Sequence, residues 1–265
     1  MFLVTGGTGT LGRLVVPQLL QAGGKVRVLS RRDHESAEGI EYAVGDLDTG
    51  AGIDAAVAGA EVVVHCAGAQ KGDGDKARTL VRAASRAEGL EGAGAPHLVN
   101  ISVTGADRVP QDGRLDRTMF GYFGMKLDAE RVIAGSGLPW TTLRATQFHD
   151  LLLMVARAMA RLPVIPVASG VRFQPVDAGD VAARMAELAA GPPSGLVPDL
   201  AGPRIYPMAD LVQSYLRAAG MRRPVVPVRL PGHAAEAVRN GANLAPERAV
   251  GRRTWEEFLA ERVGR

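Results

Sequence analysis

The sequence predicts an α/β protein with a doubly wound parallel sheet and a smaller C-terminal lobe. Up to Ala145, short apolar or β-branched segments alternate with segments of helical periodicity, which favours a parallel sheet covered on both faces. A glycine-rich loop stands between the first apolar segment and the first helical one. Beyond Gln147, prolines divide the chain into short elements. We therefore expect a core in residues 1–150, while residues 151–265 complete the sheet and form a substrate lobe, and we expect the two parts to make one compact unit.

Strands are expected where short runs of apolar or β-branched residues end at turn residues. These runs are residues 2–4, 25–30, 40–44, 61–65, 97–102 and 140–145. Helices are expected where apolar residues recur every three or four positions. These segments are residues 11–20, 51–57, 76–87, 119–134, 151–159 and 181–190, with a C-terminal helix pinned to the body by Trp255 and Phe258. A glycine-rich tract that reaches Ala95 is expected to end the helix over 76–87.

The composition argues against several classes of partner. The chain has 265 residues, of which 46% are hydrophobic and 22% charged, and its formal net charge is +3. This small, dispersed charge does not favour a nucleic-acid partner. No apolar run approaches the roughly 20 residues of a membrane span, and no signal peptide is visible ahead of the first strand. Because Cys66 is the single cysteine, no internal disulfide can form, and we expect a cytoplasmic protein that acts on a small molecule.

The glycine-rich loop follows the first expected strand at once and opens the first helix. Its glycines have the spacing Gly6-x-x-Gly9-x-x-Gly12. Loops in this context bind a dinucleotide, because glycine permits the tight turn, the close approach of the backbone to the pyrophosphate and close helix–strand packing. The anion then lies on free N–H groups at the positive end of the helix. The predicted cofactor-binding residues of the loop are Thr5, Gly6, Gly7, Thr8, Gly9, Thr10, Leu11 and Gly12.

The end of the second expected strand favours NADP(H) over NAD(H). Sites for NAD commonly have an acidic residue there, which binds the ribose 2′-hydroxyl. Here the chain reads Ser30-Arg31-Arg32, and arginine can hold a 2′-phosphate in a bidentate manner. Alternatively these are ordinary surface arginines, and Asp33 just beyond them keeps NAD(H) possible. After the third strand, Asp46 with Leu47 is placed to meet the adenine, or Asp46 is an ordinary turn residue.

A serine, a tyrosine and a lysine form the candidate catalytic group. Ser102 ends an expected strand, and Tyr122 and Lys126 lie four positions apart on an expected helix, so both can face one cleft. The ammonium would favour the phenolate form of the tyrosine for proton transfer, and the serine hydroxyl can hydrogen-bond a substrate carbonyl. A chance pair of tyrosine and lysine is the alternative. Only four of the 31 basic residues are lysines, namely Lys25, Lys71, Lys76 and Lys126. This rarity makes a chance pair of tyrosine and lysine at this spacing less frequent.

With the glycine loop and Asp46-Leu47, this group resembles the short-chain dehydrogenase/reductase superfamily, and most of all its atypical, NmrA-like branch. The supporting motifs are Ile101-Ser102-Val103-Thr104-Gly105, Lys126-Leu127-Asp128-Ala129-Glu130, Gly137-Leu138-Pro139-Trp140-Thr141-Thr142-Leu143-Arg144, Phe173-Gln174-Pro175-Val176-Asp177 and Asp180-Val181-Ala182. The resemblance implies a Rossmann fold that binds NADP(H), with the turn Cys66-Ala67-Gly68 among the cofactor-binding residues. It also implies that Tyr122 is the proton donor or acceptor, that Lys126 holds the nicotinamide ribose and that Ser102 polarises the substrate carbonyl.

The substrate-binding residues are expected just after the sixth strand, at the nicotinamide end of the cofactor. The candidates are Gln147, Phe148 and His149, and a structural, hydrogen-bonded role is the alternative for His149. The gap between the candidate serine and tyrosine is longer than in the best-known short-chain reductases, and the polar segment 107–117 within it is expected to form a loop over the site. The five histidines and the cysteine show no metal-ligand spacing.

The sequence thus predicts an oxidoreductase that transfers hydride from NADPH to a small, hydrophobic or aromatic carbonyl or quinone compound. Many NmrA-like proteins lack the catalytic pair and act as cofactor-sensing regulators, so a non-catalytic NADP(H) sensor is one alternative. A redox-neutral epimerase or dehydratase that acts on a sugar is another. The retained tyrosine and lysine favour the first hypothesis. A monomer and a homodimer are both compatible with the pattern.

Overall fold

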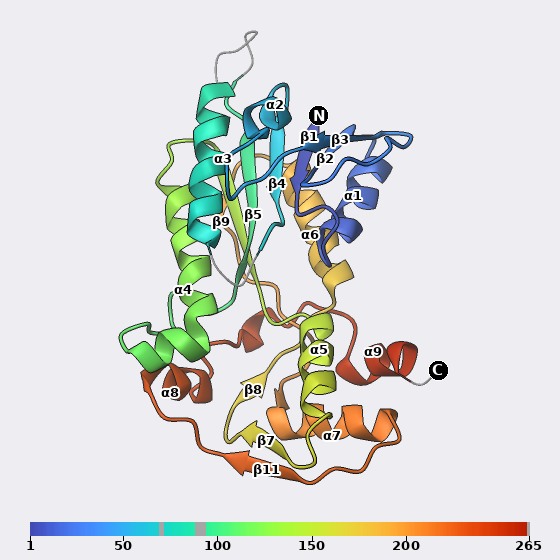
Figure 1. Cartoon of the computed structure of the whole chain (residues 1–265), viewed down its shortest axis with the longest axis vertical. Coiled ribbons are helices and arrows are strands. Elements are labelled where there is room, and N and C mark those ends of the chain that lie inside the picture. Colours follow the sequence, from blue (N-terminus) through green and yellow to red (C-terminus); the bar gives the residue numbers. More distant parts are fainter. Residues whose placement is uncertain (69–71, 88–93, 264–265) are drawn as a thin grey trace. The chain divides into compact units, whose positions relative to one another are not determined.

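The computed structural model of the chain describes residues 1–68, 72–87 and 94–263 (Figure 1). The chain divides into two compact units, each assembled from separate stretches. The first unit consists of Met1–Ser102, Met125–Leu143 and Val181–Val197. The second unit consists of Val103–Gly124, Arg144–Asp180 and Pro198–Arg265. The chain therefore passes between the units several times, and the single boundary at residue 150 stays a prediction.

The first unit is built on a seven-stranded sheet with the strand order β3-β2-β1-β4-β5-β6-β9. These strands are β1 (Phe2–Thr5), β2 (Val26–Ser30), β3 (Ile40–Val44), β4 (Val62–His65), β5 (His97–Val103), β6 (Trp140–Ala145) and β9 (Gly195–Leu196). Parallel pairing places Val4 of β1 beside Val28 of β2 on one side and Val64 of β4 on the other. The order reverses at β1, the position where doubly wound sheets bind ligands beyond their carboxyl ends. The predicted fold class is confirmed.

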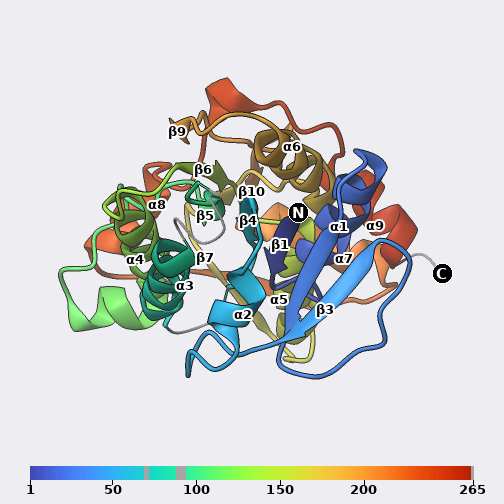
Figure 2. The same ribbon diagram turned by 90° about the horizontal axis from the view of Figure 1, so that it is seen from above.

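Helices cover both faces of this sheet. They are α1 (Gly12–Gln21), α2 (Ile53–Val57), α3 (Asp73–Ala87), α4 (Arg114–Ala134) and α6 (Ala178–Ala190). Figure 2 shows α1 and α6 on one face and α3 and α4 on the other. On the second face, Leu3 of β1, Val63 of β4 and Leu98 of β5 are buried in one cluster with Leu80 of α3 and Ile133 of α4. Successive strand residues point to opposite faces, so the near-continuous apolar strands are explained by burial on both.

The helices α3 and α4 begin three and five residues earlier than the sequence predicts, and α6 also begins three residues earlier. α3 begins at Asp73 rather than at residue 76, and its first turn carries acidic side chains that suit the positive end of the helix dipole. α4 begins at Arg114 and has Asp116 in its first turn, so the loop predicted over 107–117 is wrong in its last part. Acidic residues in the first turn mark both starts better than apolar periodicity does. The glycine-rich tract expected to end the helix over 76–87 lies for the most part outside the described residues.

The second unit contains two small sheets and the helices that pack on them. The helices are α5 (His149–Met159), α7 (Met208–Ala218), α8 (His233–Arg239), α9 (Trp255–Arg262) and the 3-10 turn η2 (Pro246–Arg248). One sheet pairs β10 (Tyr206–Pro207) with β8 (Arg172–Phe173), antiparallel, and the other pairs β11 (Val225–Val228) with β7 (Ile165–Ala168), parallel. Among the described residues, no helix is long and apolar enough to cross a membrane.

The C-terminal helix α9 is fixed to the second unit by two aromatic side chains, as the sequence predicts. Trp255 and Phe258 are fully buried in a cluster with side chains of α5 and α7. The Trp255 indole N–H donates to the hydroxyl of Ser214 at 2.9 Å. Thr254 and Glu257 form a reciprocal capping box at the start of the helix. Packing and capping therefore stabilise a helix of eight residues, which is too short to be stable alone.

Candidate cofactor and catalytic site

A cavity of about 650 Å³ lies in the first unit, beyond the carboxyl ends of β1 to β4. Its walls come from the turns that follow these four strands and from α3. The lining residues are Gly6, Thr8, Gly9, Leu29, Ser30, Arg31, Arg32, His34, Gly45, Asp46, Leu47, Asp48, Cys66, Ala67, Gly68 and Lys76. Most of the predicted cofactor-binding residues are among them. The cavity thus occupies the reversal point of the strand order, where a dinucleotide is expected.

The glycine loop borders the cavity at places where side chains would not fit. Gly6 has a φ of +68°, and a Cβ atom on it would lie 2.7 Å from the Cα atom of Ala67. Gly12, the first residue of α1, packs so closely on the Gly6 carbonyl that a side chain would overlap it. A side chain on Gly7 would overlap Val28 in the same way. The loop therefore has the tight turn and the close helix–strand packing that a dinucleotide loop requires.

Six of the predicted cofactor-binding residues do not line the cavity. They are Thr5, Gly7, Thr10, Leu11, Gly12 and Lys126. Thr5 is buried, and its hydroxyl forms a 2.7 Å hydrogen bond with Nδ1 of His65. Leu11 is also buried, in the core. Neighbouring residues of the glycine loop therefore differ in their surroundings, since some line the cavity and others, such as Thr5 and Leu11, are buried. The spacing of the glycines does not show which residues do which.

Basic and polar side chains gather where β2 ends. Arg31 and Arg32 are exposed and line the cavity. The Ser30 hydroxyl accepts a hydrogen bond from the Arg32 backbone N–H at 3.1 Å and lies 3.0 Å from Nε2 of His34. His34 also lines the cavity and packs on Tyr42, with ring centroids 4.8 Å apart. Sequence reasoning missed His34, because no motif marks it, and its position depends on how the chain turns after β2.

Two carboxylates after β3 are already engaged by the protein. The Asp46 carboxylate accepts a hydrogen bond from the Asp48 backbone N–H at 2.9 Å, so Asp46 stabilises its own turn while lining the cavity. Asp48 forms an ion pair with Lys76, at 3.1 Å between Nζ and Oδ1. Lys76 therefore joins α3 to the cavity wall. The rarity of lysine was the only sequence signal for this residue.

Lys126 reaches the cavity wall from α4 and is held by a buried acid. Its Nζ lies 3.0 Å from Oδ2 of Asp73, and both side chains are buried. A Cβ atom on Gly68, which lines the cavity, would lie 3.2 Å from the same Nζ. Asp73 was not predicted as a site residue, because its pairing depends on α3 beginning at that position. The ammonium is thus fixed beside the turn that follows β4.

The charge of Lys126 acts on the two residues that end β4 and begin this turn. Burial, reinforced by Lys126, lowers the pKa of His65 to about 4, so this imidazole is neutral at neutral pH. Burial raises the pKa of the Cys66 thiol to about 12, although Lys126 opposes the shift. The thiol is therefore protonated at neutral pH, and Cys66 lacks the thiolate character of a nucleophile.

The other two candidate catalytic residues are placed by β5 and α4. Ser102 is near the end of β5 and is 5% exposed. No group in the described part of the chain hydrogen-bonds its hydroxyl. Tyr122 lies on α4 four residues before Lys126, and 44% of its surface is exposed. One continuous helix thus carries both members of the pair, with the tyrosine accessible and the lysine buried.

The second unit holds a separate apolar pocket of about 160 Å³. Its walls come from α5, α7, β8 and the segment before α5. The lining residues are Gln147, Leu151, Leu152, Val155, Ala156, Phe173, Met208, Leu211 and Val212. Of the predicted substrate-binding residues, only Gln147 lines this pocket. Phe148 immediately precedes α5, with its backbone bridged to Val176.

His149 is a fully buried core residue of the second unit. Its ring stacks on those of Phe258 and Trp255, with centroids 4.9 Å and 5.9 Å away. Burial lowers its pKa to about 4, although Asp177, 3.9 Å from Nδ1, opposes the shift. This position favours the structural alternative for His149. The structural alternative also expects a hydrogen-bonded imidazole. Within the described chain, however, neither ring nitrogen of His149 has a hydrogen-bond partner.

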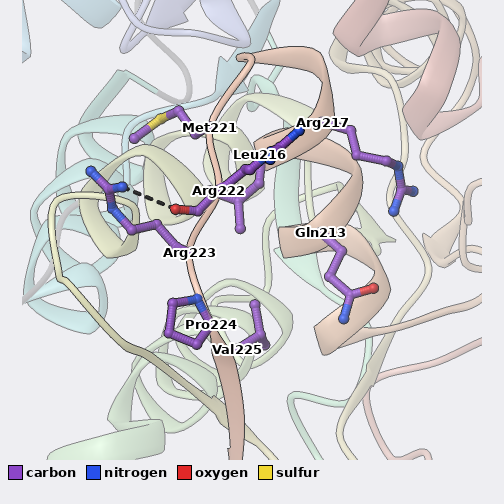
Figure 3. A pocket seen from close by; sticks show the side chains of 8 residues that line it. All are labelled: Gln213, Leu216, Arg217, Met221, Arg222, Arg223, Pro224 and Val225. Atoms are coloured by element: carbon purple, nitrogen blue, oxygen red, sulfur yellow. Dashed lines mark hydrogen bonds between the residues drawn. The ribbon is translucent and has the colours of Figure 1, made fainter.

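A second hollow in this unit, of about 470 Å³, lies beside the end of α7 and the start of β11. Its arginines do not converge on one point: Figure 3 shows the guanidinium groups of Arg217 and Arg223 directed away from each other. The Arg223 guanidinium donates to the Arg222 carbonyl at 3.0 Å. No focused anion site results. Across residues 1–68, 72–87 and 94–263, no group of three or more His, Cys, Asp or Glu side chains could hold a metal.

Comparison with known proteins identifies the family. A model of the NAD(P)H-binding family matches residues 6–191. Ceramide reductase from Caulobacter vibrioides is 32% identical over 211 residues, which cover 73% of this chain and 62% of that protein. NAD(P)H azoreductase from Xenophilus azovorans is 28% identical over 234 residues, which cover 85% of this chain and 75% of that protein. Against the first curated relatives that it matches, the chain spans about three fifths of their length.

The fold is also found in solved structures. The NADPH-dependent quinone oxidoreductase from Escherichia coli, solved in complex with NADPH, superimposes with a TM-score of 0.80 at 20% identity. The match covers 98% of this chain and 99% of that one. At this identity the likeness establishes the fold, whereas the family model, which matches most of the chain, establishes the relationship. The chain belongs to the NAD(P)H-binding family.

Proposed function

We propose that the protein is an NADPH-dependent reductase of a small carbonyl or quinone compound that is hydrophobic or aromatic. The position of Lys126 carries this proposal. Its ammonium lies beside Gly68 on the wall of the cofactor cavity, and the same helix presents Tyr122 one turn earlier. A lysine at the cavity and a tyrosine at helical spacing suit proton transfer beside a nicotinamide cofactor, the role that the family resemblance implies for this pair.

The residues of the cavity fit NADP(H). The Gly6–Gly9 backbone would approach the pyrophosphate, since Gly6 leaves no room for a side chain. Arg31 and Arg32 would hold the 2′-phosphate, and their charge favours NADPH, with NADH still able to bind. The bound cofactor supplies a hydride. Leu29, near the end of β2, and Leu47, just after β3, would line the part of the cavity that takes the adenine end of the cofactor.

The three candidate catalytic residues would protonate the substrate oxygen and stabilise the charge that develops there. In this proposal the Tyr122 hydroxyl donates a proton to that oxygen, and the Lys126 ammonium stabilises the phenolate that remains. The Ser102 hydroxyl, which lacks a hydrogen-bond partner in the described chain, donates a hydrogen bond to the same oxygen as negative charge develops there. The names of the relatives support a reductase: one reduces a ceramide and another an azo compound.

The test is NADPH oxidation with a panel of quinones, aromatic ketones and aldehydes, using the wild type and Tyr122→Phe. We expect the variant to bind NADPH normally and to lose turnover about 100-fold or more, the range of a missing general acid. Thr118→Ala is the matched control, because it removes an exposed hydroxyl from the same helix. Unchanged turnover in Tyr122→Phe would show that the tyrosine is not the proton donor.

Two other results would redirect the proposal. If NADPH binds and no compound is reduced, a cofactor-sensing protein becomes the hypothesis to pursue. If product forms without net consumption of cofactor, the reaction is redox-neutral, as in an epimerase or dehydratase. Both outcomes are visible in the same assay once product formation is followed together with NADPH absorbance.

A further inference from the structure

We propose that His34 is a positioning residue for cofactor specificity, and that its imidazole orients the Ser30 hydroxyl as a hydrogen-bond donor to the 2′-phosphate of NADP(H). Both side chains line the cofactor cavity at the end of β2, beside Arg31 and Arg32. The inference rests on the proposed binding of NADP(H) in this cavity. It adds to the charge of the two arginines a second kind of selection, which depends on where one proton lies.

The Ser30 hydroxyl is the centre of a small hydrogen-bond network. Its Oγ accepts a hydrogen bond from the Arg32 backbone N–H at 3.1 Å and lies 3.0 Å from Nε2 of His34. The imidazole packs on the ring of Tyr42 in β3, with centroids 4.8 Å apart, and this packing holds it at the end of β2. A hydroxyl group has one proton to donate and two lone pairs that accept. The contact with His34 therefore decides whether that proton is available to a ligand.

The two tautomers of a neutral imidazole present different faces of Ser30 to the cavity. When the proton is on Nε2, the imidazole donates to Oγ, both lone pairs of Oγ are occupied, and the hydroxyl proton is free for a ligand. When the proton is on Nδ1, the hydroxyl instead donates to Nε2 and offers a ligand only a lone pair. The same two side chains thus form either a donor or an acceptor site.

A 2′-phosphate matches only the donor arrangement. Its oxygens are strong hydrogen-bond acceptors, so they are stabilised by the Ser30 proton and repelled by a lone pair. The ribose 2′-hydroxyl of NAD(H) can donate as well as accept, so it matches either arrangement. An N–H of His34 directed at Ser30 therefore favours NADP(H) without a comparable effect on NAD(H). The Arg32 N–H, bound to the same oxygen, holds the turn that carries the arginines.

Two substitutions at His34 separate its hydrogen bond from its ring. His34→Gln keeps an N–H donor at the ε position and loses the ring, whereas His34→Phe keeps a ring against Tyr42 and has no N–H. The probes are adenosine 2′,5′-bisphosphate and adenosine 5′-monophosphate, which differ only in the 2′-phosphate, titrated into the whole chain.

We expect His34→Phe to lower the preference for the bisphosphate about fivefold, the usual value of one hydrogen bond, and His34→Gln to retain most of it. Binding of the monophosphate should be unchanged in both variants, which also shows that they are folded. Equal loss of the preference in the two variants, or no loss in His34→Phe, would overturn the proposal.

A double-mutant cycle tests whether His34 acts through Ser30. Ser30→Ala removes the proposed donor to a charged group and should lower the preference for the bisphosphate about tenfold. His34→Phe should then have no further effect in the Ser30→Ala background, because the hydroxyl that it orients is gone. Additive losses would show that His34 acts independently of Ser30 and would refute the assignment.

The failure of this inference and that of the proposed function look different. If the wild type binds the two nucleotides equally, the proposed preference for NADPH fails and this inference fails with it. If the wild type prefers the bisphosphate and the His34 variants keep that preference, the NADPH proposal stands and only the role of His34 is refuted. Loss of reductase turnover alone bears on neither result, because both are measured as binding.

Discussion

The cofactor cavity of the first unit and the apolar pocket of the second differ in how their polar groups are partnered. In the cavity, Lys126 pairs with Asp73, Lys76 pairs with Asp48, and Asp46 binds its own turn. Gln147, which lines the pocket, has a buried side-chain oxygen that accepts no hydrogen bond from the described residues. Ion pairs fix the geometry of the first site before a ligand arrives, whereas the second site lacks such pairs among its described lining residues. The predictions below test this contrast, beginning with the largest effect.

Breaking the buried pair should have the largest effect on stability. Asp73→Asn would leave the Lys126 ammonium buried without its counter-charge, and a loss of this kind costs about 3 to 5 kcal/mol. The double variant Asp73→Leu/Lys126→Met, which removes both charges, should recover most of that stability but not turnover. Chemical denaturation of the three proteins measures the difference. A double variant as unstable as the single one would show that packing, not charge, holds this part of the site.

Acid should destabilise both units through their buried histidines. The folded protein keeps His65 and His149 neutral down to a pKa of about 4, whereas an unfolded chain protonates histidine near 6.5. The unfolded state therefore binds more protons between these values, so the stability present above pH 6.5 is lost as the pH falls toward 4. The loss approaches about 3 kcal/mol per histidine.

His149→Phe separates the two contributions. This variant keeps an aromatic ring in the stack with Trp255 and Phe258 and removes the titrating group. Unfolding free energies measured from pH 7 to pH 4 should fall less steeply in the variant than in the wild type, and His65 and His97, whose pKa values burial also lowers, contribute to the slope that remains. An unchanged slope would mean that His149 does not contribute to acid sensitivity.

The cofactor preference should respond to Arg31 and Arg32. Replacing both by Ala removes the guanidinium groups at the end of β2 that would bind a 2′-phosphate, so NADPH affinity should fall about tenfold while NADH affinity changes little. Titration of both cofactors measures the ratio. Arg82→Ala, at an exposed position on α3 outside the cavity, is the matched control. Equal losses for NADPH and NADH would argue against a 2′-phosphate contact.

The contrast between the two sites also explains which parts could be predicted from sequence. The sheet and glycine loop are encoded by local patterns, since short apolar runs that end at turn residues and the Gly6-x-x-Gly9-x-x-Gly12 spacing are visible in short windows. The cavity residues that follow each strand were therefore found. His34 and Asp73 were missed, because a turn geometry in one case and a helix start in the other decide their positions.

The apolar pocket could not be predicted in the same way. Its lining comes from α5, β8 and α7, which are separated in sequence and meet only through tertiary packing. The apolar side chains of α5 look the same whether they fill a core or border a pocket. Gln147 was identified as a candidate from its place after β6, but the fixed orientation of its amide depends on Asn243, almost a hundred residues later.

The helix α4 has one further consequence. The residues of α4 up to Gly124 belong to the second unit and those from Met125 to the first, so Tyr122 and Lys126 are assigned to different units although one helix carries both. Their offset is therefore set by helix geometry, at about 6 Å along the axis and slightly more than one full turn. Inserting a single alanine between them would rotate one side chain by about 100° relative to the other. Insertions or deletions in the surrounding loops would therefore leave the relative orientation of Tyr122 and Lys126 unchanged. An insertion or deletion between the two residues would break the proposed proton transfer.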